Sequence, residues 1–493
     1  MMIEEEYIRL IFGLKMKQMR TEKNLSLFGL AKMTGLSKSY LNEIEKGKKY
    51  PKRDKILLLA EALESNYDHL VSLKLDKNLA PIGEILQSNI LKEIPLELFG
   101  IKESDLIDII AEAPVKVNAF ISTLFEIAKH YNLTRESFFL AALRSYQEAN
   151  NNYFDEIESQ VEKFAKAYSI DLNQKLSVTE LEEILTEEYG YTINNEELSQ
   201  HKELINLRSV FVPTSKTLLV SSETDESQRL FIYAKEIAYN YLNITDRLYT
   251  FSWIKFERFD QVLNNFLASY FAGALLIPRK PLVKKLKAFF EKKSFDAIEF
   301  QNLIAEYTDS PETFYQRLTN ILPKDFNLKN LFFLRFSYKP ERNDIKLTKE
   351  LHITNLLEPH ANESYEHYCR RWISLQTIKE IPNLEVDHLF DSQISSYTHS
   401  GVEYFTMSSA TKDPFRTGYY RSIGFGIMIT PNSSSKIAFL NDEKVKKREV
   451  GVTCESCRIA DCAERVAPPK TVEKKVRFAQ TDEVVQGIFE KYK

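Results

Sequence analysis

Residues 26–45 constrain the fold of this chain more than any other segment, because they hold two short helical patterns joined by a tight turn. Ser26 and Ser37 stand where a helix N-cap accepts a backbone N–H, and Gly35 gives the turn its backbone freedom. Apolar residues recur at helical spacing on the inner side, namely Leu30, Ala31, Leu36, Leu41 and Ile44. The pattern predicts a helix-turn-helix, the geometry that places its second helix in a DNA major groove.

The outward side of the second predicted helix carries short polar and cationic side chains suited to base edges and phosphates. We expect DNA contacts from Ser26, Ser37, Lys38, Ser39, Tyr40, Asn42, Lys46, Lys48, Lys49 and Lys52. Residues 7–56 hold 13 Lys/Arg and 4 Asp/Glu, so this segment is +9 while the whole chain is −4. Such a local basic patch is typical of phosphate binding, and a helical bundle with a solvated lysine run is the alternative.

Helical periodicity continues on both sides of the motif and predicts a five-helix unit that ends near Leu73. The segment resembles the phage-repressor, or XRE, helix-turn-helix family, whose recognition helix ends in Ile-Glu-Arg-Gly. Here the corresponding residues are Ile44, Glu45, Lys46 and Gly47. The resemblance implies a DNA-binding domain over residues 1–75. Since heads of this type commonly read two half-sites as dimers, we expect a double-stranded DNA operator and a homodimer.

The length of 493 residues is too great for one core and predicts three or four units. No stretch of eighteen apolar residues occurs, and the first residues lack the pattern of a signal peptide. Only four cysteines are present, three of them within nine residues near the C-terminus. We therefore expect a cytoplasmic protein with no membrane segment, and metal or cluster chemistry in place of disulfides.

The expected fold class is multidomain, mainly α with an α+β C-terminal half. Residues 76–171 read as almost wholly helical and predict a spacer or dimerisation bundle to which we assign no chemistry. Residues 172–327 show mixed α and β patterns, and residues 328–493 open on an alternating strand at 331–338. Two further strands are predicted at 401–407 and 420–429, so this last segment is expected to form an α+β sensor domain.

Paired strands near 208–213 and 217–221, followed by a helix over 226–242, resemble the metallopeptidase-like domain of the ImmA/IrrE family. In that family the helix carries His-Glu-x-x-His, which holds zinc, and the glutamate acts as general base. Lys235 and Tyr239 stand at the two histidine positions beside Glu236, and Asn265 stands where a carboxylate ligand is usual. An ammonium repels a divalent cation and a neutral tyrosine is a poor zinc ligand, so we expect a pseudo-peptidase and no enzyme.

Near the C-terminus, Cys454, Cys457 and Cys462 have the spacing Cys-x2-Cys-x4-Cys in a turn-rich segment. Thiolates are soft ligands for zinc or iron–sulfur clusters, and this spacing allows three sulfurs to meet at one point. Three unrelated buried thiols are the alternative. Cys369 lies 85 residues before Cys454, and we expect it to be a core thiol rather than a ligand.

An XRE head, an ImmA/IrrE-like middle and this cysteine-rich tail, which ends in Arg465 and Pro468-Pro469, together resemble the short-chain fatty acyl transcriptional regulators. The resemblance implies control of acetate or propionate metabolism through a short-chain acyl-coenzyme A. It also implies a 4Fe-4S cluster on Cys454, Cys457 and Cys462, with zinc as the lesser possibility.

The effector pocket is not localised by the sequence. Phosphate or adenine contacts are possible for Arg370, Arg371, Trp372, Arg416 and Arg421, and surface salt bridges explain the same residues equally well. Two alternative functions stay open. One is a redox- or metal-responsive repressor without an acyl ligand. The other is a metalloprotease that cleaves a partner regulator, against which the missing histidines argue.

Overall fold

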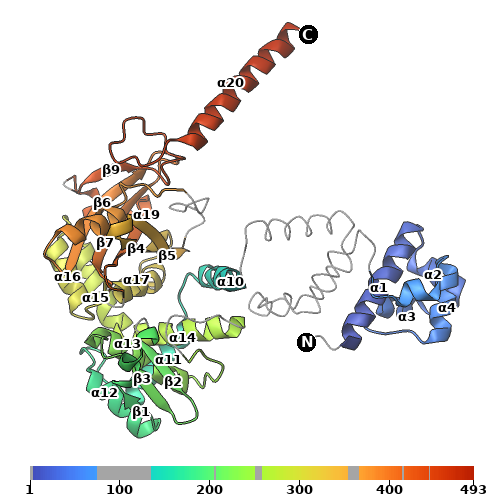
Figure 1. The fold of residues 1–493 in the computed structure, drawn as a ribbon, viewed down its shortest axis with the longest axis horizontal. Coiled ribbons are helices and arrows are strands. Elements are labelled where there is room, and N and C mark those ends of the chain that lie inside the picture. The colour runs from blue at the N-terminus through green and yellow to red at the C-terminus, as the bar shows by residue number, and fades with distance from the viewer. Residues whose placement is uncertain are drawn as a thin grey trace. The chain divides into compact units, whose positions relative to one another are not determined.

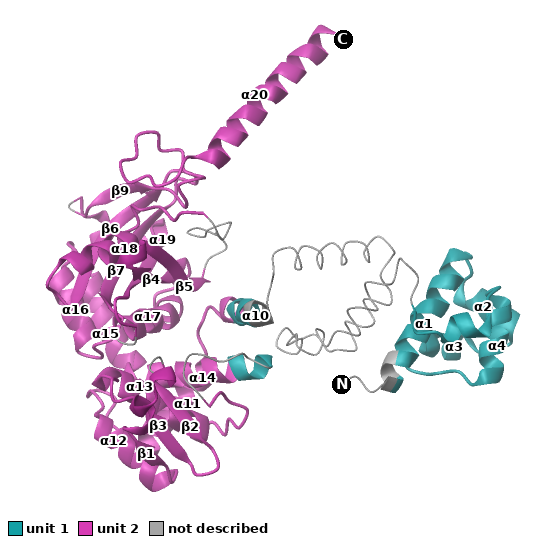
Figure 2. Ribbon diagram, viewed as in Figure 1, with its two compact units in different colours: residues 1–146, 256–262 teal, residues 147–255, 263–493 magenta. Residues whose placement is uncertain are grey.

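The computed structural model describes residues 4–74, 135–204, 207–249, 258–353, 366–413, 416–443 and 445–492. It divides into two compact units, residues 1–146 with 256–262 and residues 147–255 with 263–493 (Figure 2). The spacer helices predicted between residues 82 and 130 lie outside the described residues. No helix among the described residues combines the length and the apolarity needed to cross a membrane.

The first unit begins with the five helices that the sequence predicts (Figure 1). They are α1 (Glu4–Glu22), α2 (Leu27–Thr34), α3 (Lys38–Glu45), α4 (Arg53–Ala62) and α5 (Tyr67–Val71). Their buried apolar side chains form one core, built from Phe12, Met16, Leu30, Leu41, Ile44, Ile56, Leu59, Ala60, Leu63 and Leu70. The inward faces of both predicted motif helices contribute to it, so the helix-turn-helix prediction is confirmed at the level of the fold.

Two polar contacts fix the helices of this bundle against one another. Arg20 of α1 forms a two-pronged ion pair with Glu45 at the end of α3, with Nε–Oε1 at 2.6 Å and Nη2–Oε2 at 3.0 Å. The buried ammonium of Lys15 donates to the carbonyl of His69 at 2.9 Å and to the carbonyl of Ser72 at 2.6 Å. Because Lys15 satisfies carbonyls at the end of α5, it ties the last helix to the first.

The second unit opens with helices and a small sheet. The helices are α11 (Asp155–Ala167), α12 (Val178–Glu183), α13 (Glu226–Tyr241) and α14 (Phe259–Leu276). The first residues of α14 belong to the first unit, and α10 (Arg135–Ala149) contains the boundary between the two units. The sheet has the order β1-β3-β2, from β1 (Thr192–Asn194), β2 (Ser209–Val212) and β3 (Thr217–Val220). The antiparallel pair β2–β3 and the helix α13 match the predicted strands and helix.

A six-stranded sheet dominates the rest of the second unit, with the order β5-β4-β8-β7-β6-β9. All neighbours are antiparallel except β6 and β9. The strands are β4 (Leu331–Lys339), β5 (Asp344–Ile353), β6 (His388–Tyr397), β7 (Glu403–Lys412), β8 (Tyr420–Met428) and β9 (Lys447–Val450). The associated helices are α15 (Arg279–Phe290), α16 (Ala297–Ala305), α17 (Pro311–Asp325), α18 (Ile373–Glu380) and the short α19 (Pro431–Ser434).

Successive side chains of β4 point to opposite faces of this sheet, and different helices cover the two faces. Leu331 and Phe333 share a core with α15, α16 and α17, whereas Phe332 and Leu334 pack with Trp372 and α18. Helices α15–α17 therefore complete the sheet's core, although the sequence predicts a domain boundary at residue 327. Helix α11 likewise joins this unit, where the sequence predicts a spacer that extends to residue 171.

The chain ends in α20 (Lys470–Lys491), which extends away from the sheet and has no buried residue (Figure 1). Exposed apolar side chains of α20 include Phe478, Val485, Ile488 and Phe489, and Tyr492 at its C-cap is exposed as well. No helix was predicted for these residues from the sequence. Because no residue of α20 is buried in the described structure, packing stabilises this helix little, and its apolar side chains are open to a partner.

We predict that Gly13→Ala destabilises the five-helix bundle by about 1–3 kcal/mol, as overpacking does. A Cβ at Gly13 would lie 2.2 Å from the Ile44 carbonyl oxygen and 2.9 Å from that of Glu45, so α1 and α3 would have to separate. Gly29→Ala is the control, since its nearest atom would lie 3.4 Å away and alanine favours the helix. Amide hydrogen exchange of α1–α3 measures the difference, and equal protection in both variants would contradict the prediction.

Candidate functional site

The helix-turn-helix is held in shape by its two cap residues. The Ser26 hydroxyl accepts the Gly29 backbone N–H at 2.9 Å, and the Ser37 hydroxyl accepts that of Tyr40 at 3.2 Å. Gly35 adopts φ 69°, a left-handed conformation, and its N–H donates to the Ala31 carbonyl at 2.9 Å. Both serines therefore act as N-caps, so their expected contribution at the DNA interface is to position α3.

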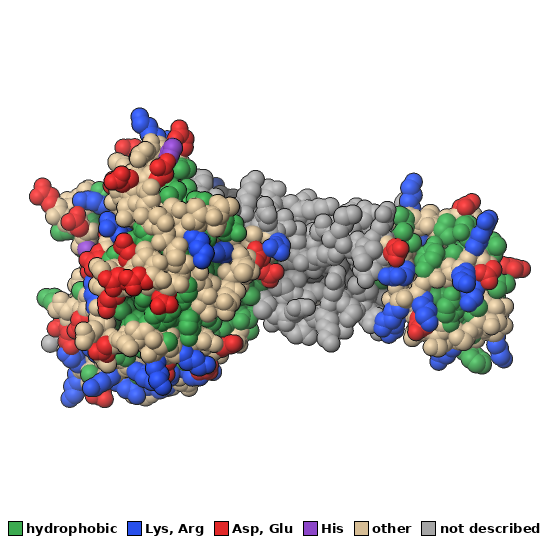
Figure 3. Space-filling model, turned by 90° about the horizontal axis from the view of Figure 1, so that it is seen from below, with side chains coloured by type: hydrophobic (Ala, Val, Ile, Leu, Met, Phe, Trp, Pro, Cys, Tyr) green, Lys and Arg blue, Asp and Glu red, His purple; other side chains and the backbone are tan. Residues whose placement is uncertain are grey.

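Helix α3 presents Lys38, Ser39 and Asn42 to solvent, as predicted for a reading helix. Tyr40 is half-buried, and its ring lies beneath two cations, with the Lys55 ammonium 4.5 Å and the Lys49 ammonium 5.9 Å from the ring centroid. Lysine and arginine side chains are spread over the face of this unit that Figure 3 shows, with hydrophobic side chains among them. Polar readers on one helix with cations beside them form a surface suited to a DNA groove and its phosphates.

The lysines expected to meet phosphates are not equivalent. Lys48 and Lys52 are exposed, and Lys46 is half-buried at the C-cap of α3. Lys49 forms an ion pair with Glu43 at 2.8 Å, and the hydrogen bond to Glu43 raises the pKa of the Lys49 ammonium. Glu43 therefore offsets part of the positive charge that Lys49 brings to the surface.

The three positions identified as lost metal ligands lie together in the second unit. The Lys235 ammonium donates to Asn265 Oδ1 at 2.6 Å, and the Tyr239 hydroxyl donates to the same oxygen at 3.4 Å. Burial lowers the pKa of Lys235 to about 7. A hydrogen-bonded Lys–Asn–Tyr cluster thus occupies the place where the resemblance puts a metal ion.

Glu236, the residue at the general-base position, is engaged by other side chains. Arg247 Nη2 lies 2.5 Å from Glu236 Oε1, and the Tyr191 hydroxyl donates to Glu236 Oε2 at 3.0 Å. The Arg247 guanidinium also stacks over Tyr239, 3.9 Å from the ring centroid. A carboxylate held in this way balances a buried cation, a structural task that explains its presence without catalysis.

The cysteine motif forms a loop that one arginine organises. Arg465 Nη1 donates to the Cys454 carbonyl at 2.7 Å, and Arg465 Nη2 donates to the Cys457 and Ile459 carbonyls at 3.3 and 2.5 Å. Cys454 and Cys457 are buried, and Cys462 is half-buried. No three Cys, His, Asp or Glu side chains are placed to hold a metal ion within the described ranges.

The side chain of Arg370 is suited to a negatively charged group bound at these cysteines. Its Nε and Nη1 atoms are buried without a hydrogen-bond partner in the described part of the chain. Burial lowers the pKa of Arg370, while Cys454 and Cys369 raise it through their nearby charge when ionised. Cluster sulfurs would give these N–H groups acceptors, so Cys454, Cys457 and Cys462 with Arg370 suit an anionic metal–thiolate centre.

Cys369 belongs to the core, as the sequence predicts. It is buried with Trp372 and Phe336, and its sulfur accepts the Gly451 N–H at 3.3 Å. Burial raises the pKa of the Cys369 thiol to about 11, so this sulfur is neutral at physiological pH.

The five residues considered for phosphate or adenine contact separate into two groups. Trp372 Nε1 donates to the Gly451 carbonyl at 2.9 Å and Arg371 Nε pairs with Glu464 at 3.0 Å, so these two lie with Arg370 at the cysteine motif. Arg416 and Arg421 lie elsewhere, at the side of the sheet that faces α17. Arg416 Nη2 donates to the Ser337 hydroxyl at 3.0 Å, and Arg421 Nε donates to the Thr411 hydroxyl at 3.2 Å.

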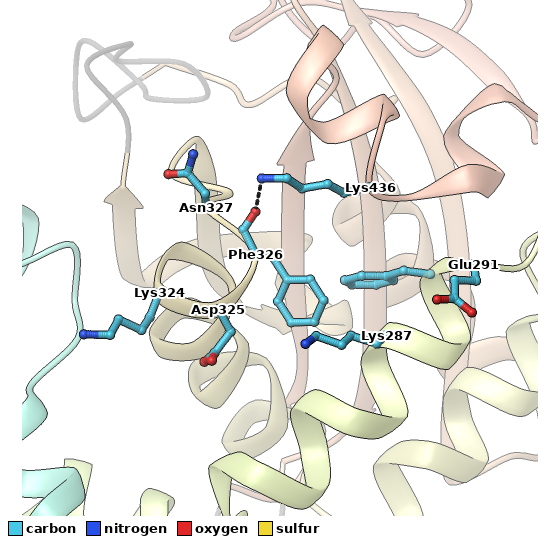
Figure 4. Close-up of a pocket in the computed structure, with 8 residues that line it drawn as sticks. Lys287, Glu291, Lys324, Asp325, Phe326, Asn327 and Lys436 are labelled. Atoms are coloured by element: carbon cyan, nitrogen blue, oxygen red, sulfur yellow. Dashed lines mark hydrogen bonds between the residues drawn. The ribbon is translucent and has the colours of Figure 1, made fainter.

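A surface pocket of about 330 Å³ lies between α15 and the end of α17 (Figure 4). Its lysines are largely engaged, since Lys324 pairs with Asp155 at 2.8 Å and Lys436 donates to the Phe326 carbonyl. Asp325 is bound by Arg279, and Glu291 adds a further carboxylate to the wall. The pocket therefore lacks a surplus of available cations for an anionic ligand.

Sequence reasoning missed Arg208, Glu312, Arg335 and Lys349, which gather near Arg421. Arg335 Nη1 pairs with Glu312 of α17 at 2.9 Å, although the two residues are 23 positions apart. One signal was available: Arg335 interrupts the inward-facing series Leu331, Phe333 and Ser337 on β4. A charge at an inward strand position indicates a buried polar site.

Residues 16–70 match the family model described as Helix-turn-helix. No curated protein matches the chain at a significant level. Among solved structures, a Mycobacterium tuberculosis transcriptional regulator is similar, with 17% identity and a TM-score of 0.47, over 66% of this chain and 92% of that chain. The first unit thus contains an XRE-type helix-turn-helix domain, the DNA-binding module of transcriptional regulators.

We predict that substitutions at residues that contact bases and at residues that contact phosphates change DNA affinity in different ways. Asn42→Ala should reduce discrimination against a mutated operator by about 1–3 kcal/mol, because an amide can bond a base edge. Lys48→Ala should weaken binding to all duplexes alike and reduce the slope of log affinity against log salt by about one. Fluorescence anisotropy over a range of salt concentrations separates the two effects. Equal loss of specificity in both variants would contradict this division of roles.

Proposed function

We propose that this protein is a sequence-specific DNA-binding transcriptional regulator whose C-terminal half senses a short-chain acyl-coenzyme A. The single observation that carries the DNA-binding part is the capped helix-turn-helix, with Lys38, Ser39 and Asn42 exposed on its second helix. The acyl-coenzyme A part rests on the resemblance of the three-part chain to the short-chain fatty acyl regulators. Regulation requires that the ligand bind the free and the DNA-bound protein unequally.

In this proposal the ImmA/IrrE-like region has no peptidase activity. The Lys235 ammonium hydrogen-bonds Asn265 where a metal would stand, and Glu236 is committed to Arg247. Water activation by this class of site requires both a bound metal and a free carboxylate. The region is then a scaffold that connects the DNA-binding head to the sensor.

The proposal places a 4Fe-4S cluster, with zinc as the alternative, on Cys454, Cys457 and Cys462. Such a cluster supplies redox or structural chemistry, and Arg370 and Arg465 are the residues of this chain that support it. Arg370 has buried Nε and Nη1 groups and lies within electrostatic range of Cys454, and Arg465 holds the loop through three carbonyls. The buried Nε and Nη1 atoms of Arg370 also favour the second candidate function, a redox-responsive repressor in which the cluster itself is the sensor.

The proposal includes a homodimer formed through α20. Phe478, Val485, Phe489 and Tyr492 follow one another at spacings of seven, four and three residues and so share one helix face. Residues 470–480 carry four Lys/Arg and one Asp/Glu, whereas residues 481–491 carry three Asp/Glu and one lysine. Antiparallel pairing of two copies would bury the apolar faces and place the basic half of one helix beside the acidic half of the other.

The effector part of the proposal is tested by calorimetry with acetyl-, propionyl- and butyryl-coenzyme A on the intact protein. We expect saturable binding of at least one of them. Absence of binding by all three would remove the acyl sensor and leave the redox-responsive repressor.

Anaerobic purification tests the cluster. We expect brown protein whose colour and iron are lost in Cys454→Ser, Cys457→Ser and Cys462→Ser, because each removes one ligand, and retained in the matched control Cys369→Ser. Colourless protein with stoichiometric zinc would show that the three cysteines bind zinc and not an iron–sulfur cluster. Folded protein without metal would show that these are unrelated buried thiols.

Light scattering tests the dimer with two substitutions on opposite faces of α20. Val485→Asp should convert the dimer to a monomer, because it places a charge in the apolar stripe. Val476→Asp is the control, since Val476 is also exposed but lies outside that stripe. A monomeric wild type, or equal masses for both variants, would contradict pairing through this face.

A further inference from the structure

Three adjacent strands of the six-stranded sheet place cations on one face. Arg335 on β4 stands directly opposite Lys349 on β5, and Ser337, two residues further along β4, stands opposite Arg421 on β8. Alternation puts all of these side chains on the face that packs against α17. Like charges directly opposite each other destabilise a sheet, so this arrangement is unfavourable for folding alone.

Further cations reach the same place from other elements. Arg416 comes from the segment between β7 and β8 and donates to the Ser337 hydroxyl at 3.0 Å. Arg208 immediately precedes β2, and its pKa is lowered to about 10, chiefly by burial and further by Arg421 and Arg335. Lys235 of α13 lies within the electrostatic range of Lys349 and Arg208, which lower its pKa in addition to burial. We call Arg208, Arg335, Lys349, Arg416 and Arg421 the sheet-face cation cluster.

Two carboxylates of the described residues form ion pairs within this cluster. Glu312 pairs with Arg335 at 2.9 Å, and Asp413 pairs with Arg416 at 2.6 Å. Burial alone would raise the pKa of Glu312, but Arg335, Lys349, Arg421 and Arg208 together hold it at about 2. One half-buried carboxylate is thus acted on by four cations that come from the sheet and from the β2 region. Among the described residues, Glu312 and Asp413 pair with Arg335 and Arg416, and Lys349 and Arg421 add further positive charge beside them.

The sheet-face cation cluster is accessible to a ligand. Lys349 is exposed to solvent, and Arg208, Arg335 and Arg421 are only half-buried. Arginine and lysine side chains that remain accessible can hold an anion through charge-assisted hydrogen bonds, which are stronger than hydrogen bonds between neutral groups. The hydroxyls of Thr348 and Thr411 lie beside Arg335 and Arg421 and add hydrogen-bonding groups.

We propose that the sheet-face cation cluster is the binding site for the phosphate groups of the small-molecule effector. The inference rests on the proposed sensing function, and it identifies the residues of this protein that would bind the effector. Guanidinium forks on neighbouring strands match a phosphate or pyrophosphate, which offers several oxygens to more than one arginine. Bound anion would remove the repulsion between Arg335 and Lys349, so binding stabilises the sheet together with the adjoining α17 and β2 regions.

Calorimetry and thermal unfolding of the full chain test this site, with coenzyme A, propionyl-coenzyme A and inorganic pyrophosphate as probes at constant ionic strength. Lys349→Gln is the test variant, because Lys349 is exposed and its loss relieves like-charge repulsion. We expect Lys349→Gln to unfold at a higher temperature than wild type without ligand, and to bind the probes about tenfold more weakly. Lys287→Gln alters an exposed lysine of the pocket in Figure 4 and serves as the control that binds as wild type does.

The outcomes separate this inference from the proposed function. Wild-type binding of propionyl-coenzyme A that is unchanged in Lys349→Gln would overturn the site and leave acyl sensing intact. Pyrophosphate binding that depends on Lys349, without binding of either coenzyme A probe, would support the site and overturn acyl sensing. If Lys287→Gln and Lys349→Gln weakened probe binding equally, the loss would be an effect of general surface charge, and the proposed site would be wrong.

Discussion

The second unit depends on a buried ion pair between Glu158 of α11 and Arg317 of α17. Arg317 Nη1 and Nη2 donate to the two carboxylate oxygens at 2.6 and 2.9 Å, and its Nε donates to the Ile277 carbonyl at 2.9 Å. The Tyr270 hydroxyl of α14 also donates to Glu158, at 2.8 Å. Because one guanidinium joins α11, α14 and α17, loss of either partner would leave a buried charge, which costs about 3–5 kcal/mol in comparable sites.

Helix α17 then links that pair to the site proposed for the effector. Arg317 faces the helical part of the unit, while Glu312, five residues earlier, faces the sheet and holds Arg335. A ligand that changes the charge balance around Glu312 would act on the helix that carries Arg317. Lys235 and Arg208 provide a second connection, because they bring α13 and the start of β2 into the same electrostatic environment. The region of α13 and β2 is thus coupled to the sheet by charge.

The sequence predicted features that depend on local pattern. Capping serines, a turn glycine and helical periodicity indicated the helix-turn-helix, and Lys235, Tyr239 and Asn265 were grouped through a resemblance and do lie together. Arg335, Lys349, Arg421 and Glu312 were not grouped, because strand register and helix packing bring them together and neither follows from spacing along the chain. Domain boundaries were uncertain for the same reason, since α15–α17 precede the sheet whose core they complete.

The central claim is that an effector bound to the C-terminal half changes how tightly the helix-turn-helix holds its operator. The direct measurement is operator affinity by fluorescence anisotropy, on a duplex selected from the source genome, across a titration of propionyl-coenzyme A with full-length protein. Our account predicts a saturable change in operator affinity, and it predicts that saturating DNA changes the effector affinity by the same factor, as linkage requires. Operator affinity that stays constant while calorimetry shows the effector bound would contradict the account.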